Sequence, residues 1–445
     1  MMAAANTREV EDRLTADELH DAWPLLSYED RAELIQALPR DEAEDVFLAA
    51  GAIDQAGIIR ALPHQERRSW MRLLAPDDAA DVVQAAEEAE RDGLLSLLDD
   101  QTRREVTALL AYADDRAGGL MNPRYARLRP DMSVDEAISY LRRQARDVSE
   151  SIYYAYVVDD EQRLLGVVSF RELFACDPVK RLREVMHTDL VTVREDQDQE
   201  SVSRLFDQHR FIAIPVVDAE GRMKGIVTVD DIVDVVREEA TEDIQKIGGT
   251  QALDAPYLQI SLPSMVKKRV GWLAGLFVSE MLTTTAMSRF EAEISRAVVL
   301  AVFVPLIISG GGNSGSQAST LVIRAMVLGE VRPRDGWRVV RRELATGLLM
   351  GAVLGAIAFS RVELWQFIFH PYGPHHMLVA ATIAGSVVGV VTWGTLAGSM
   401  LPFLLRGVGL DPASASAPFV ATLVDVTGIV IYFTVASIVL RGTLL

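Results

Sequence analysis

The last apolar stretch of the chain, residues 417–440, holds one charged residue, Asp425. The stretch is long enough to cross a lipid bilayer, which takes about 20 apolar residues. A carboxylate inside such a helix costs at least ~2.5–3.5 kcal/mol, and it normally faces a cavity or an ion path rather than lipid. Asp425 therefore predicts a place where a cation meets the membrane-spanning part of the chain.

The neighbours of Asp425 indicate which cation fits. Small or weakly polar residues share its helix face at helical spacings: Pro418, Ala421, Thr422 and Gly428. Mg²⁺ sheds water reluctantly and usually binds through one or two carboxylates, so a single Asp among small residues suits a hydrated Mg²⁺ ion. A Zn²⁺ site would need His or Cys, and the apolar stretches contain neither.

A second polar motif lies in residues 305–320, where three consecutive glycines begin at Gly310. Consecutive glycines make a poor helix interior, and irregular backbone at membrane depth usually lines a cavity. Close helix packing through small residues is the alternative, and both can hold at once. The motif also offers neutral dipoles to a hydrated ion: Asn313, Ser316, Gln317 and Thr320.

Five apolar stretches follow position 265, at roughly 270–288, 297–328, 344–360, 377–405 and 417–440. The second and fourth exceed one straight span and contain Gly or Pro, so we expect tilted or broken helices there. Basic residues, which favour the cytoplasmic side, precede the first stretch and flank the second-to-third and fourth-to-fifth connections. We expect a multi-pass protein of the cell (inner) membrane with a cytoplasmic N-terminal part and the C-terminus outside.

Charge divides the chain of 445 residues, whose net charge is −19. Residues 1–260 carry a net −24 and residues 261–445 a net +5. An acidic folded domain argues against nucleic acid and for cations as partners. The single Cys176 excludes a disulfide within the chain and a multi-cysteine metal site. The N-terminus has no apolar segment typical of a cleavable signal peptide.

An internal repeat of 59 positions lies in residues 121–240, where Val157–Glu172 recurs as Val216–Asp231. Each copy predicts a strand, a polar turn, a strand and a helix start. The order resembles a tandem pair of CBS domains, and such pairs commonly bind adenine nucleotides. In that reading the glycine of each copy lets the chain approach the ligand, the hydroxyl of Ser169 or Thr228 caps a helix, and the acid binds a ribose hydroxyl. The alternative is that both hydroxyl residues only cap helices.

The helical segment 10–115 contains a weak 36-residue repeat, which suggests a stacked helical superhelix. Asp41 and Asp45 in one copy match Asp77 and Asp81 in the other, and each pair lies on one helix face. Two such carboxylates repel each other unless a cation lies between them. A solvated acidic face is the alternative for any single pair.

A further acidic run follows the second CBS-like copy, and its carboxylates keep helical spacing: Asp231, Asp234, Glu238, Glu239, Glu242 and Asp243. Oxygen donors without His or Cys suit hard cations such as Mg²⁺ or Ca²⁺. The spacing does not match an EF-hand loop. Because the chain also carries an Asp within a membrane span, we expect this acidic run to sense cations.

The membrane motifs, together with Leu401–Arg406 and Leu410–Pro412, are similar to the MgtE family of magnesium channels. The resemblance covers nearly the whole chain and implies a multidomain membrane protein that is not an enzyme. Its expected parts are an all-α superhelical N domain (1–120), an α+β CBS pair (121–180 and 181–250), a connecting plug helix (251–268) and a five-helix transmembrane domain (269–445).

The resemblance also implies functional residues. A homodimer would form its pore from the second and fifth spans, with Asp425 and the Ala421 carbonyl holding hydrated Mg²⁺. Cytosolic Mg²⁺ would lock the closed state by bridging acidic residues: Asp45, Asp77, Asp81, Asp198, Glu200, Asp231, Asp234, Glu239, Glu242, Asp243 and Asp411. ATP would bind at Tyr154, Arg171, Glu172 and Phe211.

Three positions depart from the family pattern. Arg210 stands where an acidic sensor residue is expected, which puts one inter-domain metal bridge in doubt. Ala417 lacks a polar side chain that some members have. Glu280 lies mid-span where we recognise no family acid, and it either lines an accessory cavity or has a protonated packing role.

Three other function classes compete with a magnesium channel. A CBS-regulated membrane protease needs His-Glu-x-x-His on a helix, and no such motif occurs. The ion path of a chloride channel needs positively charged groups, whereas the last apolar stretch of this chain carries the negatively charged Asp425. A broader divalent-cation transporter for Mn²⁺ or Co²⁺, or a cation/Mg²⁺ exchanger, remains open because these ions also accept oxygen ligands.

Overall fold

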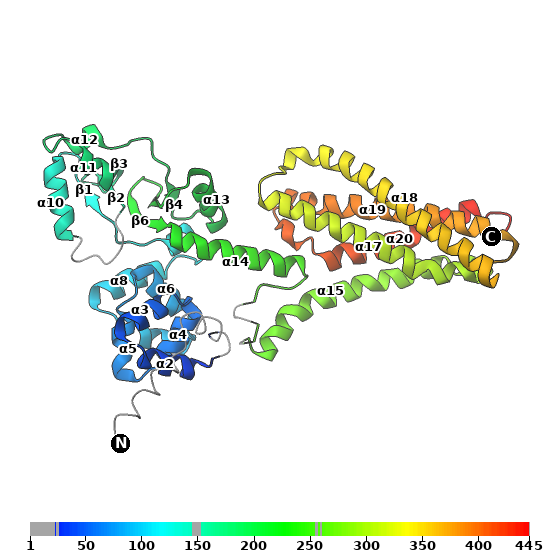
Figure 1. Cartoon of the computed structure of the whole chain (residues 1–445), viewed down its shortest axis with the longest axis horizontal. Coiled ribbons are helices and arrows are strands. Elements are labelled where there is room, and N and C mark those ends of the chain that lie inside the picture. The colour runs from blue at the N-terminus through cyan, green and yellow to red at the C-terminus, as the bar shows by residue number, and fades with distance from the viewer. Residues whose placement is uncertain (1–22, 24–25, 145–152, 254–256, 259, 445) are drawn as a thin grey trace, which may run out of the picture. The chain divides into compact units, whose positions relative to one another are not determined.

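A computed structural model of the chain (Figure 1) describes residues 23, 26–144, 153–253, 257–258 and 260–444. It divides into two compact units, Met1–Arg237 and Glu238–Leu445. The first unit contains a helical stack and two small sheets, and the second contains long apolar helices. The multidomain architecture predicted from the sequence is confirmed.

The helical stack at the start of the first unit consists of short helices of similar length. Among the described residues these are α2 (Tyr28–Ala37), α3 (Arg40–Leu48), α4 (Ala52–Ala61), α5 (His64–Met71), α6 (Pro76–Ala85), α7 (Glu88–Leu95), α8 (Asp100–Leu109) and α9 (Ala117–Leu120). Helices α2, α4, α6 and α8 pack on one another in order, while α3, α5 and α7 each pack on the helix before them.

A spacing of 12 residues separates the starts of α2 to α8. The structural repeat is therefore a pair of helices, and the 36-residue sequence match spans three helices. Asp41 and Asp45 accordingly lie on α3 of the outer row, whereas Asp77 and Asp81 lie on α6 of the inner row. The superhelix was expected correctly, but the matched carboxylates do not occupy equivalent positions.

The repeat in residues 121–240 folds into two three-stranded sheets of the same order. The first comprises β1 (Arg127–Leu128), β2 (Tyr154–Val158) and β3 (Leu164–Ser169), and the second β4 (Val193–Arg194), β5 (Ala213–Val217) and β6 (Met223–Thr228). In each sheet the first pair of strands is parallel and the second antiparallel. The intervening helices are α10 (Val134–Gln144), α11 (Phe170–Ala175), α12 (Leu182–Val185) and α13 (Gln199–His209).

The two copies agree in detail. Val157 pairs with Gly166 just before a bulge, and Val216 pairs with Gly225 just before the corresponding bulge. The turns are also alike, because Asp159 and Asp218 each accept hydrogen bonds from backbone amides two and four residues later. The sequence repeat therefore predicted a true structural repeat.

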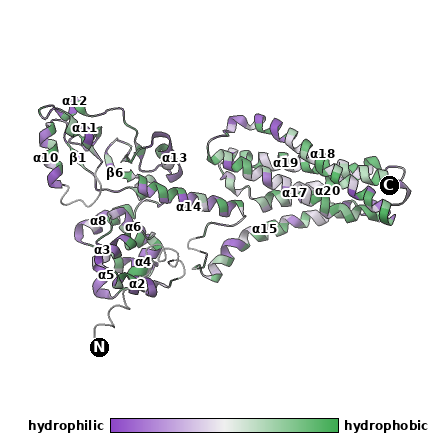
Figure 2. Ribbon diagram, in the orientation of Figure 1, coloured by the Kyte–Doolittle hydropathy of each residue, from purple (hydrophilic) through white to green (hydrophobic). Residues whose placement is uncertain are grey.

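Five helices in the described part of the second unit are long and apolar enough to cross a membrane. They are α15 (Leu262–Arg289), α17 (Val298–Val327), α18 (Gly336–Phe369), α19 (His376–Gly407) and α20 (Ala417–Val439), joined by the shorter α16 (Glu291–Arg296), η2 (Pro333–Asp335), η3 (Gly373–His375) and η4 (Pro412–Ser414). In Figure 2 the green of hydrophobic residues recurs along the ribbons of these helices. Helices α17, α19 and α20 pack on one another, and α18 packs on α19.

Two expectations about this unit need correction. Helices α17 and α19 are each continuous despite Pro305 and Pro402, so of the expected tilted or broken helices the broken alternative does not hold. The plug helix expected at 251–268 is also absent as a separate element in the described part of that range. Instead α14 (Val229–Ile247) extends the second CBS copy, and α15 begins at Leu262, where Ser261 caps it and Pro263 fits the first turn.

Candidate functional site

The pairing of α17 with α20 places the two membrane motifs side by side. The Ser316 hydroxyl donates to the Ala417 carbonyl at 3.1 Å, and the Ser319 hydroxyl donates to the Ala415 carbonyl at 2.9 Å. A Cβ atom added to Gly312 would lie 3.6 Å from Ala421 and 3.9 Å from an Asp425 carboxylate oxygen. The missing side chain of Gly312 thus leaves room beside Asp425.

The other glycines of the motif serve a different purpose. A Cβ on Gly311 would lie 2.5 Å from Val390, and one on Gly315 would lie 2.8 Å from the Gly394 carbonyl oxygen. These glycines let α17 approach the glycine-containing face of α19, as small residues do in membrane helices. Helix packing and space beside the carboxylate, the two alternatives from the sequence, therefore both hold.

One face of α17 carries polar residues that the single chain leaves uncovered. Asn313, Gln317 and Thr320 are exposed and Ser316 is half-buried, in the middle of an apolar helix. Exposed amides and hydroxyls at membrane depth need water or a protein partner. This face suits a water-filled path or a second copy of the chain.

Glu280 adds a second carboxylate to this region. It lies on α15, which packs against α20, and it is half-buried. Its charge interacts unfavourably with that of Asp425. The sequence signal for Glu280 was its mid-span position, but only the fold connects it to Asp425.

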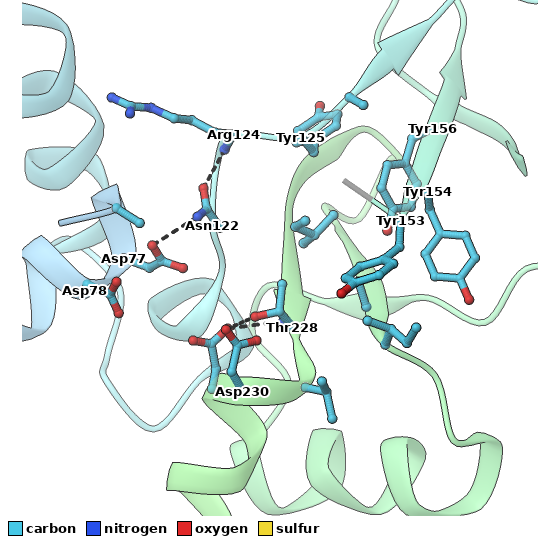
Figure 3. A pocket seen from close by; sticks show the side chains of 17 residues that line it. Asp77, Asp78, Asn122, Arg124, Tyr125, Tyr153, Tyr154, Tyr156, Thr228 and Asp230 are labelled. Atoms are coloured by element: carbon cyan, nitrogen blue, oxygen red, sulfur yellow. Dashed lines mark hydrogen bonds between the residues drawn. The ribbon is translucent and has the colours of Figure 1, made fainter. Parts of the chain in front are cut away.

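A second acidic site lies within the first unit, in a cavity of about 510 Å³ between the helical stack and the second CBS copy (Figure 3). Asp77 and Asp78 from the start of α6 face Asp230 and Asp231 from the start of α14. Asp77 is only 7% exposed and accepts a hydrogen bond from the Asn122 side chain at 3.1 Å. Two predicted sensor residues, Asp77 and Asp231, are thereby brought together.

Carboxylates outnumber basic groups among the described residues that line this cavity. Arg124 lines the cavity, but its guanidinium binds Glu105 at 2.8 Å and the Thr102 hydroxyl at 2.7 Å. Burial, with added repulsion from Asp230 and Asp78, raises the pKa of Asp231 to about 7 even though Thr228 donates to its carboxylate. Burial and Asp230 also raise the pKa of Asp78.

This donor set fits a hard cation, because carboxylate oxygens are the ligands that Mg²⁺ prefers. An added positive charge would also relieve the repulsion that, after burial, contributes to these raised pKa values. Among the described residues no group of three or more His, Cys, Asp or Glu side chains is already arranged to hold a metal ion. A bound ion would therefore have to draw the carboxylates closer or keep part of its water.

The remaining predicted sensor residues are distributed over other surfaces. Asp45 and Asp81 are exposed on α3 and α6, and Asp234 is exposed 3.5 Å from Arg237. Asp198 precedes α13 and Glu200 pairs with Arg204 at 2.9 Å in its first turn. Glu239 and Asp243 are half-buried on α14. None of these residues lines the described cavity. The charge of Asp234 nevertheless helps to raise the pKa of Asp78, which does line it.

Two predicted sensors in the second unit, Glu242 and Asp411, both contact Lys246. Lys246 Nζ lies 2.5 Å from the Glu242 carboxylate and 2.7 Å from the Asp411 carboxylate. Asp411 also accepts a hydrogen bond from the Ala413 amide at 2.9 Å, which caps η4. Glu242 and Asp411 thus share one ammonium of the chain itself, which offsets one of their two negative charges.

The four predicted nucleotide residues are not gathered in the cavity. Tyr154 lines it with Thr228 and Asp231, whereas Arg171, Glu172 and Phe211 do not. The Glu172 carboxylate accepts from Ser169 in a capping box and contacts His187 at 2.5 Å. The Phe211 ring stacks on His209 at 5.2 Å, and Arg171 is exposed.

In both CBS copies the repeated glycine lies close to other parts of the chain. A Cβ on Gly166 would lie 2.6 Å from the Met186 sulfur, and one on Gly225 would lie 2.6 Å from the Asn122 carbonyl oxygen. Both glycines therefore accommodate neighbouring residues of the chain, and a role in ligand approach stays a prediction. The capping role of Ser169, by contrast, is observed directly.

Sequence reasoning missed several residues of these sites. Asp78 follows the predicted sensor Asp77, and Asp230 precedes the predicted sensor Asp231. These adjacent positions could have pointed to both residues. Lys246 follows Glu242 by four positions on a helix, a spacing that predicts an ion pair. Asn122 had no signal, because its contact with Asp77 spans 45 positions.

Comparison with known proteins supplies independent information. The family described as MgtE, divalent cation transporter, matches residues 304–435; the MgtE intracellular N domain matches 14–115; and CBS domains match 117–177 and 182–238. The magnesium transporter MgtE of Thermus thermophilus is 44% identical over 344 residues, which cover 77% of this chain and 74% of that protein. The magnesium transporter MgtE of Enterococcus faecalis is 34% identical, with 76% of this chain and 72% of that protein covered.

A solved structure, the cytosolic domain of the Mg²⁺ channel MgtE in complex with ATP, is 43% identical with a TM-score of 0.47. It covers 51% of this chain and 93% of that one. The sequence relatives match across the soluble half and the membrane half in the expected order. This chain belongs to the MgtE family of divalent cation transporters.

Proposed function

We propose that this protein is a Mg²⁺-selective channel for magnesium uptake across the cell membrane, active as a homodimer. Asp425 and the Ala421 carbonyl would hold hydrated Mg²⁺ between the second and fifth spans of the two subunits. The soluble half lies in the cytoplasm and the C-terminus outside. Two sequence relatives carry the name magnesium transporter, which supports the ion, and the family description supports divalent cations more broadly.

The observation that carries the proposal is the uncovered polar face of α17 beside Asp425. Asn313 and Gln317 are exposed within an apolar span, and Gly312 leaves space next to the carboxylate. Such groups are costly against lipid. A water-filled path between two subunits accommodates them and supplies the carboxylate with its cation.

Ion selectivity tests this assignment. Asp425→Ala in the full-length protein, reconstituted in liposomes, is expected to lower Mg²⁺ flux at least about tenfold, a change worth ~1.4 kcal/mol. Glu330→Gln is a matched control, because Glu330 is exposed in the connection before η2. Unchanged Mg²⁺ selectivity in Asp425→Ala would remove the central assignment. Equal transport of Mn²⁺ or Co²⁺ by the wild type would favour the broader divalent-cation transporter instead.

For gating, we propose that cytosolic Mg²⁺ binds between the acidic N and CBS domains and stabilises the closed channel. The cavity around Asp77 and Asp231 supports this role, because it brings together carboxylates from α6 and α14. Mg²⁺ shifts the equilibrium only if it binds the closed arrangement more tightly than the open one. Asp45, Asp81, Asp198, Glu200, Asp234, Glu239 and Asp243 remain proposed contributors.

Patch recording at varied cytosolic Mg²⁺ tests the gating proposal. Wild-type currents are expected to fall as internal Mg²⁺ rises, and Asp231→Asn is expected to require more Mg²⁺ for closure. Asp207→Asn, an exposed acid on α13, is the control. Currents that ignore internal Mg²⁺ would end the gating proposal and leave the transport proposal intact.

ATP remains a proposed modulator at Tyr154, Arg171, Glu172 and Phe211. The exposed guanidinium of Arg171 and the ring of Phe211 offer a phosphate partner and a stacking surface. Calorimetry with the full-length protein should show weaker ATP binding in Arg171→Ala than in Arg183→Ala, which changes another exposed arginine, on α12. Equal affinities in both variants would rule out this site.

A further inference from the structure

The end of α14 is packed into the membrane-domain unit. Ile247 contacts a small hydrophobic cluster built on Ile323, Ala413 and Ala415. Two residues later Gly249 adopts a positive φ of 75°, where a Cβ would lie 3.0 Å from Trp272 and 3.2 Å from Pro418. The last turn of α14 is therefore seated against α15, α17 and the start of α20 at once.

Backbone and side-chain hydrogen bonds hold the segment after α14 in place. Gln245 accepts from the Thr250 hydroxyl at 2.9 Å through its carbonyl and from the Leu253 amide at 2.7 Å through its side chain. The Gln251 amide donates to the Lys268 carbonyl of α15 at 3.3 Å. These contacts make residues 245–253 a compact joint rather than a loose linker.

Lys246 is the only side chain of the joint that, in the described structure, ties α14 ionically to the connection before α20. Its ammonium lies between Glu242 on its own helix and Asp411, which caps η4. Ser416 then caps α20 and also accepts a hydrogen bond from Trp272 at 3.2 Å. A continuous set of contacts thus runs from Lys246 to the helix that carries Asp425.

The lysine is suited to a permanent contact. Its ammonium contacts both carboxylates directly, at 2.5 Å from Glu242 and 2.7 Å from Asp411. A Mg²⁺ ion would have to displace this ammonium before it reached Glu242 and Asp411 together.

We propose that Lys246 is a built-in latch that fastens the end of α14 to the segment leading into α20, with no need for Mg²⁺ at this joint. The inference rests on the proposed gating function and adds a positioning residue to it. Movement of α14 would reach α20 through Lys246 and Asp411. Glu242 and Asp411 then belong to the latch and not to the set of Mg²⁺ sensors.

The test combines gating and stability measurements on the full-length protein. Lys246→Gln is expected to shift the cytosolic Mg²⁺ concentration for half-closure by about fivefold or more, within the usual range of coupling between sites. Lys246→Arg should restore wild-type gating, as should the charge exchange Lys246→Asp with Asp411→Lys. Lys267→Gln is the matched control, since Lys267 is exposed on α15. Selectivity for Mg²⁺ should be unchanged in every variant.

A second measurement does not depend on transport. A double-mutant cycle between Lys246 and Asp411, read from thermal unfolding in detergent, should show coupling that the pair Lys267 and Asp411 lacks. Absent coupling would overturn the latch, and so would coupling with unaltered Mg²⁺ gating in Lys246→Gln. A wild type that passes current but ignores internal Mg²⁺ would defeat the proposed gating, while the cycle would still decide whether the latch exists.

Discussion

Single residues of one type have different roles in this protein according to which helix face they occupy. Gly311 and Gly315 let α17 approach α19, whereas Gly312, one position from Gly311, opens space beside Asp425. Because successive residues on a helix point about 100° apart, consecutive glycines face different neighbours. The role of each glycine follows from its neighbour and not from the motif as a whole.

The raised pKa of Asp231 leads to a prediction about pH. With a pKa of about 7, the carboxyl group is mostly ionised at pH 8 and mostly protonated at pH 6. Its ionised fraction falls about tenfold over that interval, so more cytosolic Mg²⁺ should be needed for half-closure at pH 6. Patch recording at both pH values measures this shift.

Asp231→Asn is the control for that experiment and should have a weaker pH dependence. In the absence of Mg²⁺, low pH acts in the opposite direction, because it increases the contribution of Asp231 to the free energy of unfolding. An Asp whose pKa is raised in the folded state binds protons that the unfolded chain releases, so this group favours folding more as pH falls from above 7 toward 4. Equal pH responses of the wild type and Asp231→Asn would contradict the assignment.

Glu280 leads to a second prediction at this scale. Its charge adds to that of Asp425 across α15 and α20, so Glu280→Gln should weaken the attraction of Mg²⁺ and lower the current mainly at low external Mg²⁺. Currents recorded over a range of external Mg²⁺ measure the effect. Glu291→Gln, an exposed acid in α16, serves as control. Unchanged current and pH response would leave Glu280 with a packing role.

At the scale of elements, the contact between α17 and α19 depends on the absence of side chains. A Cβ on Gly315 would lie 2.8 Å from the Gly394 carbonyl oxygen, so Gly315→Ala must push the helices apart. Overpacking of this kind typically costs about 1–3 kcal/mol. We expect a lower midpoint of thermal unfolding in detergent.

Gly310→Ala is the matched variant for this prediction. Its new Cβ would meet only Val391, at 3.8 Å, which is an ordinary contact. Alanine also favours a helix interior by about 0.5–1 kcal/mol relative to glycine. The two substitutions should therefore change stability in opposite directions, and a similar loss in both would contradict the packing argument.

The soluble elements show how a sequence repeat can mislead about position. Helices of the N-terminal stack begin every 12 residues, and two of them form one structural unit. A match over 36 residues spans an odd number of helices, so Asp45 lies on the outer row while Asp77 is buried on the inner row. Composition and repeat length predicted the superhelix, but not which helix of each pair faces the CBS domains.

At the scale of the whole molecule, the net charge of −24 on residues 1–260 opposes a compact arrangement. Mg²⁺ that binds the folded soluble half should stabilise it, by about 2.7 kcal/mol at a concentration one hundred times the Kd. Limited proteolysis of the full-length protein at increasing Mg²⁺ should show growing protection of the soluble half. NaCl at matched ionic strength is the control, and equal protection by NaCl would indicate screening rather than binding.

The sequence by itself determined the order of domains, the CBS repeat, the five spans and the importance of Asp425. These depend on local periodicity, composition and the cost of a charge among apolar residues, which neighbouring residues already reveal. Tertiary structure alone decided that Asp78 and Asp230 join Asp77 and Asp231, and that Lys246 occupies the space between Glu242 and Asp411. The acids of α6 and α14, and likewise Lys246 and Asp411, come together across 150 or more positions, and their contacts depend on how whole helices pack, which no local pattern records.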